Sequence, residues 1–196
     1  MNTEFKQLKS QLQKLIFIDE NSLALSYDFL NYKTIPKGEY LVQEGQHYSK
    51  LTFVSKGIFR HFVRKDGNEI TTGFSLENSF IIIPGSLMNK VLSDTNIRAL
   101  ENSIVLTISN SDLLRLAETN FNWQMIILNL LDKEHYKLHE RLYSMNFDTA
   151  ATRYKKTIKE CPDLLKRVSI LHLSSYVGVS RETLSRIRSK LDNFHF

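Results

Sequence analysis

The spacing of apolar residues divides the chain into a helical start, a strand-rich middle and a helical C-terminal part. Near the N-terminus apolar side chains return every three or four positions, as at Phe5 and Leu8, which predicts an amphipathic helix. A second short helix is expected to end near Leu30, with Asp19 or Asn21 as its N-cap. The first thirty residues are therefore predicted to be mainly helical.

From Lys33 to about Ser109, short apolar stretches alternate with turn residues, and no long helical pattern separates them. The segment Asp66-Gly67-Asn68 is typical of the tight turn of a β-hairpin. The predicted strands are residues 40–42, 51–55, 58–64, 70–75 and 105–108. Many short strands joined by turns indicate an antiparallel β-roll of the jelly-roll type.

Beyond Ser109 the apolar period becomes helical, and the longest predicted helix runs from about Trp123 to Met145. Six positions of this helix follow the alternating three- and four-residue spacing of a heptad seam. They are Leu128, Leu131, His135, Leu138, Leu142 and Met145. Such a stripe is typical either of a face packed on the chain's own core or of a two-stranded dimer axis. Because a strand domain precedes it, we interpret the helix as the dimerisation helix.

The segment 170–191 has the pattern of a helix-turn-helix. A first helix is expected to end at Gly178, because glycine takes the left-handed backbone that opens a tight turn. Ser180 is a suitable N-cap for a second helix. This second helix has Leu184, Ile187 and Leu191 on one face and basic residues on the other, which is the layout of a DNA-reading helix.

The chemistry of the second helix fits DNA. An arginine can form two hydrogen bonds to guanine in the major groove, and a glutamate can accept a hydrogen bond from cytosine. Arg181 and Glu182 fall in the first turn of this helix, and Arg186 follows rather more than one turn later. The alternative is a pair of ordinary packed helices with a solvated basic face.

The pattern Gly-x-Ser-Arg-Glu-Thr-x-x-Arg, which runs from Gly178 to Arg186, closely resembles the recognition helix of the CRP/FNR family of bacterial transcription regulators. The resemblance implies base contacts from Arg181, Glu182 and Arg186 and phosphate contacts from Ser180 and Thr183. The family's β-hairpin wing after this helix is expected to be short or missing here. Arg188 and Lys190 are expected to contact phosphates in its place.

The middle of the chain resembles the same family. Ile35–Gly45, Phe53–Gly57 and Lys65–Gly67 follow one another as in its cyclic-nucleotide-binding-like β-roll. The resemblance covers residues from about 33 to 191. It implies a homodimer bound to a pseudo-palindromic operator in double-stranded DNA, and it leaves RNA polymerase and an unidentified small-molecule effector as further partners.

The chain departs from the cyclic-AMP binders of this family, which carry a Gly-Glu pair followed by an Arg-Ser pair. Here Ile82 and Ile83 fall near the first pair and Ser93 and Asp94 near the second, so the groups that bind ribose and phosphate are lost. Cyclic AMP is therefore not expected to be the effector. An effector pocket of another kind is predicted around Ile82, Ile83, Ser93, Arg98 and His139.

Composition and charge agree with this picture. The chain has 196 residues and a net charge of +5, but residues 141–196 carry eleven Lys or Arg against five Asp or Glu. A basic C-terminal part on a nearly neutral body favours a polyanion as partner. The single cysteine, Cys161, excludes an internal disulfide and fits a reducing compartment. The N-terminus has no signal-peptide or membrane-anchor pattern.

The sequence thus predicts an α+β protein with three parts. They are a β-roll sensor domain (1–120), a long dimerisation helix (121–146) and a helix-turn-helix DNA-binding domain (147–196). We expect a cytoplasmic, sequence-specific transcription regulator without cofactor or metal, and not an enzyme, because no catalytic pattern is present. His135 and His139 have a metal-pair spacing, but Tyr136 stands where zinc proteases have glutamate. The alternative is a ligand- or partner-binding β-roll without specific DNA binding.

Overall fold

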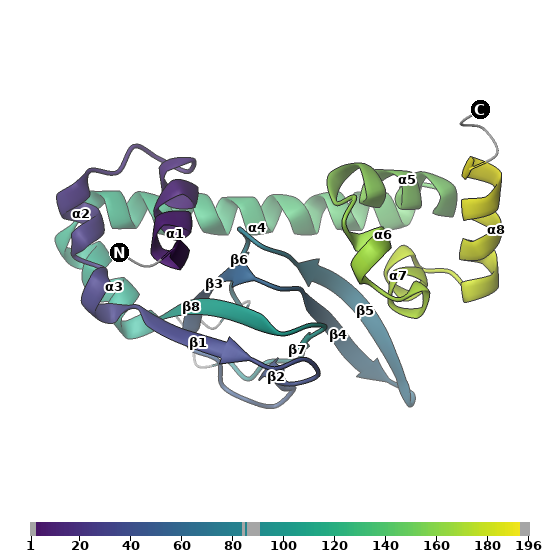
Figure 1. Cartoon of the computed structure of the whole chain (residues 1–196), viewed down its shortest axis with the longest axis horizontal. Coiled ribbons are helices and arrows are strands. Elements are labelled where there is room, and N and C mark those ends of the chain that lie inside the picture. Colours follow the sequence, from purple (N-terminus) through teal and green to yellow (C-terminus); the bar gives the residue numbers. More distant parts are fainter. Residues whose placement is uncertain (1–2, 84, 86–90, 193–196) are drawn as a thin grey trace. The chain divides into compact units, whose positions relative to one another are not determined.

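The structure is a computed structural model that describes residues 3–83, 85 and 91–192 (Figure 1). The chain forms two compact units. The first contains the residues up to Val63 together with Gly73–Glu134, and the second contains Arg64–Thr72 together with the residues from His135 onward. One long helix, α4 (Phe121–Phe147), contributes to both units.

The N-terminal segment of the first unit is helical, as its apolar spacing predicts. Its elements are α1 (Thr3–Gln13), α2 (Glu20–Ala24) and the 3-10 helix η1 (Tyr27–Phe29). Leu8 and Leu12 form the buried face of α1. The carboxylate of Asp19 accepts a hydrogen bond from the backbone N–H of Ser22 at 2.9 Å, so Asp19 is the N-cap of α2.

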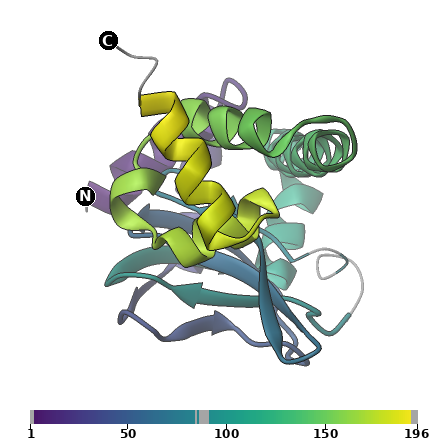
Figure 2. The same ribbon diagram turned by 90° about the vertical axis from the view of Figure 1, so that its right-hand side faces the viewer.

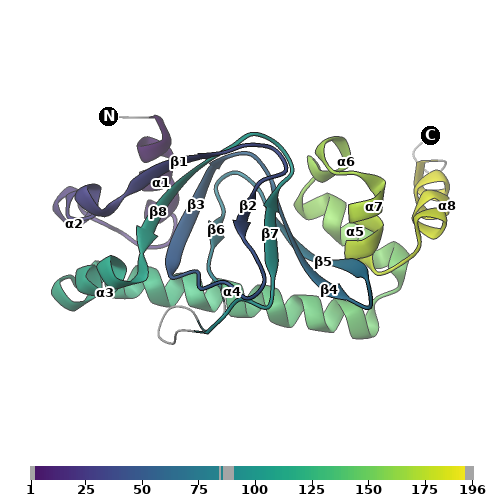
Figure 3. The same cartoon turned by 90° about the horizontal axis from the view of Figure 1, so that it is seen from below.

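Eight strands follow and form two antiparallel four-stranded sheets (Figures 1 and 3). The strands are β1 (Asn31–Ile35), β2 (Tyr40–Val42), β3 (Lys50–Lys56), β4 (Phe59–Lys65), β5 (Asn68–Ser75), β6 (Phe80–Ile81), β7 (Asn96–Ala99) and β8 (Ser103–Ser109). The first sheet has the order β1-β8-β3-β6 and the second the order β2-β7-β4-β5. Neighbours in each sheet include strands far apart in sequence, as in a jelly roll.

The two sheets enclose one apolar core. Val54 and Val105 from the first sheet meet Phe59, Ile97 and Ala99 from the second, and all five side chains are buried. The registers place Phe59 opposite Ala99 and His61 opposite Ile97 on the interior side of β4 and β7. Because strand side chains alternate, Arg60 and Arg98 lie on the outer side of the same sheet.

Helices cover the outer face of the first sheet. Phe53 and Leu106 point away from the roll interior and pack against α1, α3 (Asn110–Thr119) and the start of α4. Trp123 in the first turn of α4 is buried there, and its indole N–H donates to the Ser22 carbonyl oxygen at 2.8 Å. The first turns of α4 are thus fixed to the β-roll.

The second unit contains a small helical domain (Figure 2). Its helices are α5 (Ala150–Glu160), α6 (Leu164–Arg167), α7 (Ile170–Val177) and α8 (Arg181–Asp192). Tyr154, Leu173, Val177 and Leu184 form its buried core. Helices α5, α7 and α8 each contribute apolar residues at helical spacing, and the small core that these residues form holds the three helices together.

The predicted fold class is confirmed: an antiparallel β-roll precedes a long helix and a C-terminal helix-turn-helix. The sequence analysis did not identify the strands β1, β6 and β7 or helix α6. The N-cap of α3 is Ser109, whose hydroxyl accepts the backbone N–H of Asp112 at 3.0 Å. The prediction of a short or missing wing concerns residues after α8, which lie outside the described residues.

Two further findings concern the described residues alone. None of their helices is both long and apolar enough to cross a membrane. Within the same residues no group of three or more His, Cys, Asp and Glu side chains is placed to hold a metal ion.

Candidate nucleic-acid interface

The turn between α7 and α8 is built by a glycine. Gly178 has φ 78° and ψ 42°, a left-handed conformation in which a side chain is strained. Its N–H donates to the Ser174 and Ser175 carbonyls, and the N–H of Val179 donates to the Ser174 carbonyl at 3.1 Å. This is the Schellman pattern of a helix C-terminus, and it ends α7 three residues before α8 begins at Arg181.

The second helix of the motif begins with a side-chain cap. The Ser180 hydroxyl accepts the backbone N–H of Thr183 at 3.2 Å, and the two side-chain oxygens lie 3.1 Å apart. Both residues are exposed. The Ser180 hydroxyl therefore satisfies one backbone N–H of the first turn of α8. Both side chains remain accessible at this helix start, where the phosphate contacts are predicted.

One edge of α8 is fixed by packing. Leu184 is fully buried, and Ile187 and Leu191 pack partly buried against the same core, which includes Leu173 and Val177 of α7. The three residues recur at spacings of three and four along α8, as the sequence predicts. α8 is therefore held against α7 by its apolar edge.

The exposed surface of α8 carries the predicted base-contacting residues. Arg181, Glu182 and Arg186 are all exposed. Glu182 has its pKa lowered by hydrogen bonds from its own backbone N–H and the Ser180 hydroxyl, with smaller contributions from the two arginines. The lowered pKa favours the ionised carboxylate of Glu182, which can accept hydrogen bonds, and the guanidinium groups of Arg181 and Arg186 are hydrogen-bond donors on the same helix.

The predicted phosphate contacts of this helix differ in exposure. Lys190 is exposed, as expected, whereas Arg188 is half-buried. At about 100° per residue, Arg188 lies only about 40° around the helix from Leu184, beside the packed edge. The sequence analysis placed Arg188 on the face opposite the apolar residues, and its position beside Leu184 corrects that placement.

The predicted dimer seam of α4 is exposed along its length. Leu128, Leu138 and Leu142 keep 58%, 61% and 64% of their surface exposed, and Leu131, His135 and Met145 are exposed as well. The residues that pack α4 onto the β-roll, such as Trp123, Ile126 and Leu130, lie on a different face. The seam is therefore an apolar stripe that the described chain leaves uncovered.

The predicted effector residues are not gathered in one place. Ile83 is in the roll interior, whereas Ile82 packs with the helices outside the first sheet. Ser93 is buried, and its hydroxyl donates to the Thr95 carbonyl at 2.7 Å. Arg98 lies on the outer side of the second sheet, with its guanidinium 5.7 Å from the centre of the Tyr40 ring and 5.4 Å from that of the Phe62 ring.

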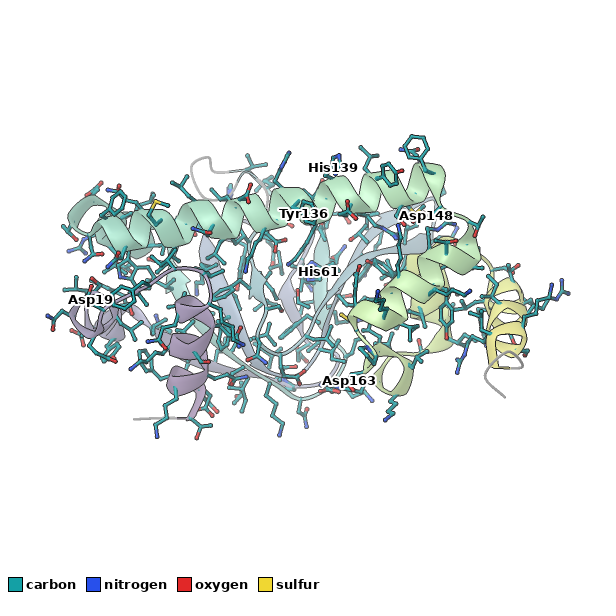
Figure 4. All side chains as sticks on the ribbon, turned by 90° about the horizontal axis from the view of Figure 1, so that it is seen from above. Asp19, His61, Tyr136, His139, Asp148 and Asp163 are labelled. Carbon is teal, nitrogen blue, oxygen red and sulfur yellow. The ribbon has the colours of Figure 1, made fainter. Side chains whose placement is uncertain are left out.

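His139, the fifth predicted effector residue, is an exposed side chain on α4 (Figure 4). Its imidazole Nδ1 lies 3.9 Å from a carboxylate oxygen of Glu140. The first four predicted residues thus occupy separate positions on the β-roll, and the effector assignment stays a prediction.

The sequence analysis missed two features of the β-roll. Arg60 has only 1% of its surface exposed, and its guanidinium lies 4.4 Å from the centre of the Phe62 ring. The Nε2 atom of His61 lies 2.8 Å from the Ser75 hydroxyl oxygen (Figure 4). The alternation of side chains along β4 predicts which face of the sheet each residue lies on, but it does not predict which side chain that residue contacts.

Around α7 the sequence analysis missed a set of polar contacts. Arg141 of α4 and Arg153 of α5 donate to carbonyl oxygens in its last turn. The Ser175 hydroxyl accepts the backbone N–H of Thr71 in strand β5 at 2.8 Å. No local spacing announces these contacts, because each joins segments far apart in the sequence.

Comparison with known proteins agrees with the fold. Residues 32–120 match the family model of the cyclic nucleotide-binding domain. FixK2 from Bradyrhizobium japonicum superposes with a TM-score of 0.72 at 18% identity, covering 84% of this chain and 85% of that one. The c-di-GMP-responsive global regulator CLP of Xanthomonas campestris gives 0.68 at 20% identity, covering 89% and 92%.

The catabolite activator protein of Thermus thermophilus is also similar, with a TM-score of 0.59 at 20% identity and coverage of 93% and 87%. No curated protein matches the sequence closely enough to count as a relative. The chain therefore has the fold of regulators built from a β-roll, a long helix and a helix-turn-helix. The likeness confirms the fold that the resemblance to the CRP/FNR family predicts, and residues 32–120 match the model of the cyclic nucleotide-binding domain.

Proposed function

We propose that the protein is a homodimeric, sequence-specific DNA-binding transcription regulator. The observation that carries this proposal is the division of α8 into two edges. Leu184 is fully buried, whereas Arg181, Glu182 and Arg186 are exposed. A short helix fixed on one edge and polar on the other, after a glycine turn, suits insertion into a major groove.

Each exposed residue has a distinct role in the proposed complex. Arg181 and Arg186 donate paired hydrogen bonds to guanine, and the Glu182 carboxylate accepts a hydrogen bond from cytosine. Ser180 and Thr183 bind phosphate at the helix start. Arg188 and Lys190 add phosphate contacts, and the half-buried stem of Arg188 leaves its head at the margin of the helix.

The exposed seam of α4 supports a two-fold dimer. Contiguous apolar surface of this kind is unfavourable in water and marks an interaction site. Six positions at heptad spacing fit a second copy of the same helix, because each leucine can enter a hole between the partner's side chains. Two copies of α8 would then occupy half-sites about one helical turn, roughly 10 base pairs, apart.

We further propose that the β-roll senses an effector other than cyclic AMP. The match of residues 32–120 supports a ligand-sensing ancestry for this domain. Ile83 is a buried core residue where the cyclic-AMP binders would need a polar group, and the exposed Asp94 would repel a phosphate. Titration calorimetry is expected to show no cyclic-AMP binding, and a micromolar dissociation constant would contradict this part of the proposal.

The remaining partners follow from DNA binding. A regulator that reads an operator acts in the compartment that holds the DNA, so we place the protein in the cytoplasm. RNA polymerase is the further partner that transcription control requires.

The test is selection of bound sites from random duplex DNA, followed by titration of the selected site. The expected result is two related half-sites about 10 base pairs apart. Arg186→Ala should lose about 1–3 kcal/mol of binding free energy and relax the preference at one base pair. Arg115→Ala, an exposed arginine of α3, is the matched control. Recovery of unrelated sequences would refute the proposal and favour a ligand- or partner-binding β-roll.

A further inference from the structure

The last turn of α7 is the point from which the chain turns into α8. A helix ends with four carbonyl oxygens that have no partner within the helix. Here the Ser174 and Ser175 carbonyls accept the N–H groups of Gly178 and Val179. The carbonyls of Tyr176 and Val177 are the other two of these four groups.

Two arginines from other helices donate hydrogen bonds to these two carbonyl oxygens. The Arg141 Nη2 of α4 donates to the Tyr176 carbonyl, and the Arg153 Nε of α5 donates to the Val177 carbonyl at 2.7 Å. Positive charge at a helix C-terminus also interacts favourably with the helix dipole. We call Arg141 and Arg153 the arginine clamp.

Each arginine has a second contact that fixes its direction. The Arg141 guanidinium lies 4.2 Å from the centre of the Tyr176 ring, and burial lowers the pKa of Arg141. Arg153 donates through Nη1 to the Asp148 carbonyl at 2.7 Å, in the turn where α4 gives way to α5 (Figure 4). A planar guanidinium held at two points keeps little rotational freedom.

The clamp therefore joins the C-terminal part of α4 to the start of the recognition helix. Arg141 makes this connection directly, and Arg153 makes it through the α4–α5 turn. Met145 of α4 reinforces it, because its methyl carbon lies 3.2 Å from the position that a Cβ of Gly178 would take. All these residues belong to one compact unit.

We propose that Arg141 and Arg153 are positioning residues that fix the orientation of α8 relative to the dimer helix and so set the half-site spacing that the dimer accepts. This inference rests on the proposed function. Inserting one base pair turns one half-site by roughly 35° about the DNA axis and moves it by about 3.4 Å. A rigid pair of recognition helices cannot follow that change, whereas a loosened pair can.

The test measures affinity for the selected operator and for versions with one base pair more or fewer between the half-sites. The wild-type protein should bind the altered sites at least about tenfold more weakly. Arg141→Ala and Arg153→Ala should bind the selected site more weakly and discriminate less than about threefold between spacings. Lys155→Ala, an exposed residue of α5, should keep the wild-type profile.

Lysine variants separate charge from geometry. Arg141→Lys and Arg153→Lys keep the positive charge but lose the planar two-point contact, so they should flatten the spacing profile as the alanine variants do. If the lysine variants keep the wild-type profile, charge alone acts and the positioning role is wrong. Urea unfolding of each variant confirms that the folded protein is being compared.

A second measurement needs no DNA. Spin labels on Ser189→Cys in a Cys161→Ser background report the distance between the two α8 helices of a dimer by electron spin resonance. The clamp variants should broaden a narrow wild-type distribution. An unchanged width together with an unchanged spacing profile would overturn the clamp, whereas absence of DNA binding by the wild type would overturn the proposed function instead.

Discussion

Removing leucine side chains from the exposed seam of α4 should dissociate the protein without unfolding it. Leu142 keeps 64% of its surface exposed in the single chain, so its truncation creates no cavity in the monomer. In a dimer that covers the seam, the same side chain is removed from water. The variant Leu142→Ala therefore separates association from folding.

The size of the effect follows from the exposed fraction. Leucine to alanine removes three carbons, worth about 2.4 kcal/mol for complete burial at about 0.8 kcal/mol each. Scaled by the 64% that a partner can still cover, this becomes about 1.5 kcal/mol per chain. Two copies per dimer give about 3 kcal/mol, which raises the dimer dissociation constant about 150-fold.

Sedimentation equilibrium over a range of protein concentrations measures this constant. Leu25→Ala is the matched control, because Leu25 is an exposed leucine at the end of α2 and is not one of the six seam residues. The control should leave the dimer constant unchanged, and the free energy of unfolding of both variants should stay within about 0.5 kcal/mol of wild type. A dimer of unchanged strength with Leu142→Ala would refute the seam.

Two further predictions concern the second compact unit. Gly178→Ala should lower the unfolding free energy measured in urea by about 1–2 kcal/mol, because φ is 78° there. Gly67→Ala is the control, because Gly67 has a φ of 76° but no atom within 4 Å of an added Cβ. The loss of stability in the control therefore reports backbone strain without steric crowding. Asp148 has its pKa lowered below 3.8 by hydrogen bonds from Lys156 and Ser144. Its stabilisation is therefore present above about pH 4 and lost as the pH falls through the lowered pKa. The melting temperature of wild type should converge on that of Asp148→Asn in acid.

The sequence predicts the helix-turn-helix well because its determinants are local. The turn requires only the left-handed backbone conformation of Gly178. The N-cap of α8 requires only that the Ser180 hydroxyl accept a backbone N–H three residues further along the chain. The spacing of Leu184, Ile187 and Leu191 marks the packed edge without knowledge of the partner. Such features are encoded within about one helical turn, so predicting them does not require knowledge of contacts with distant parts of the chain.

Features that depend on tertiary packing were not predictable. Arg60 is a charged residue, a type that is seldom fully buried, and its alternating pattern in β4 gave no sign of the Phe62 stack. The Arg141 and Arg153 contacts join residues 35 and 24 positions apart. The half-burial of Arg188 follows from its angle beside Leu184, which a simple division into polar and apolar faces overlooks.

The β-roll shows the same limit in another form. Turn residues located the β4–β5 hairpin, but the two-residue strand β6 and the four-residue strand β7 lack enough positions to show a period. Their existence depends on partners such as β3 and β4, which are distant in the sequence. The predicted effector residues inherited this uncertainty, and the structure distributes them over several faces.

The most direct test of the central claim couples one arginine to one base. Each guanine of the selected half-site is replaced in turn by 7-deazaguanine, which lacks the N7 acceptor that an arginine uses. At one position the replacement should cost the wild-type protein about 1–3 kcal/mol and cost Arg186→Ala almost nothing. If every replacement weakens both proteins equally, Arg186 does not contact a guanine and α8 does not bind the groove as described.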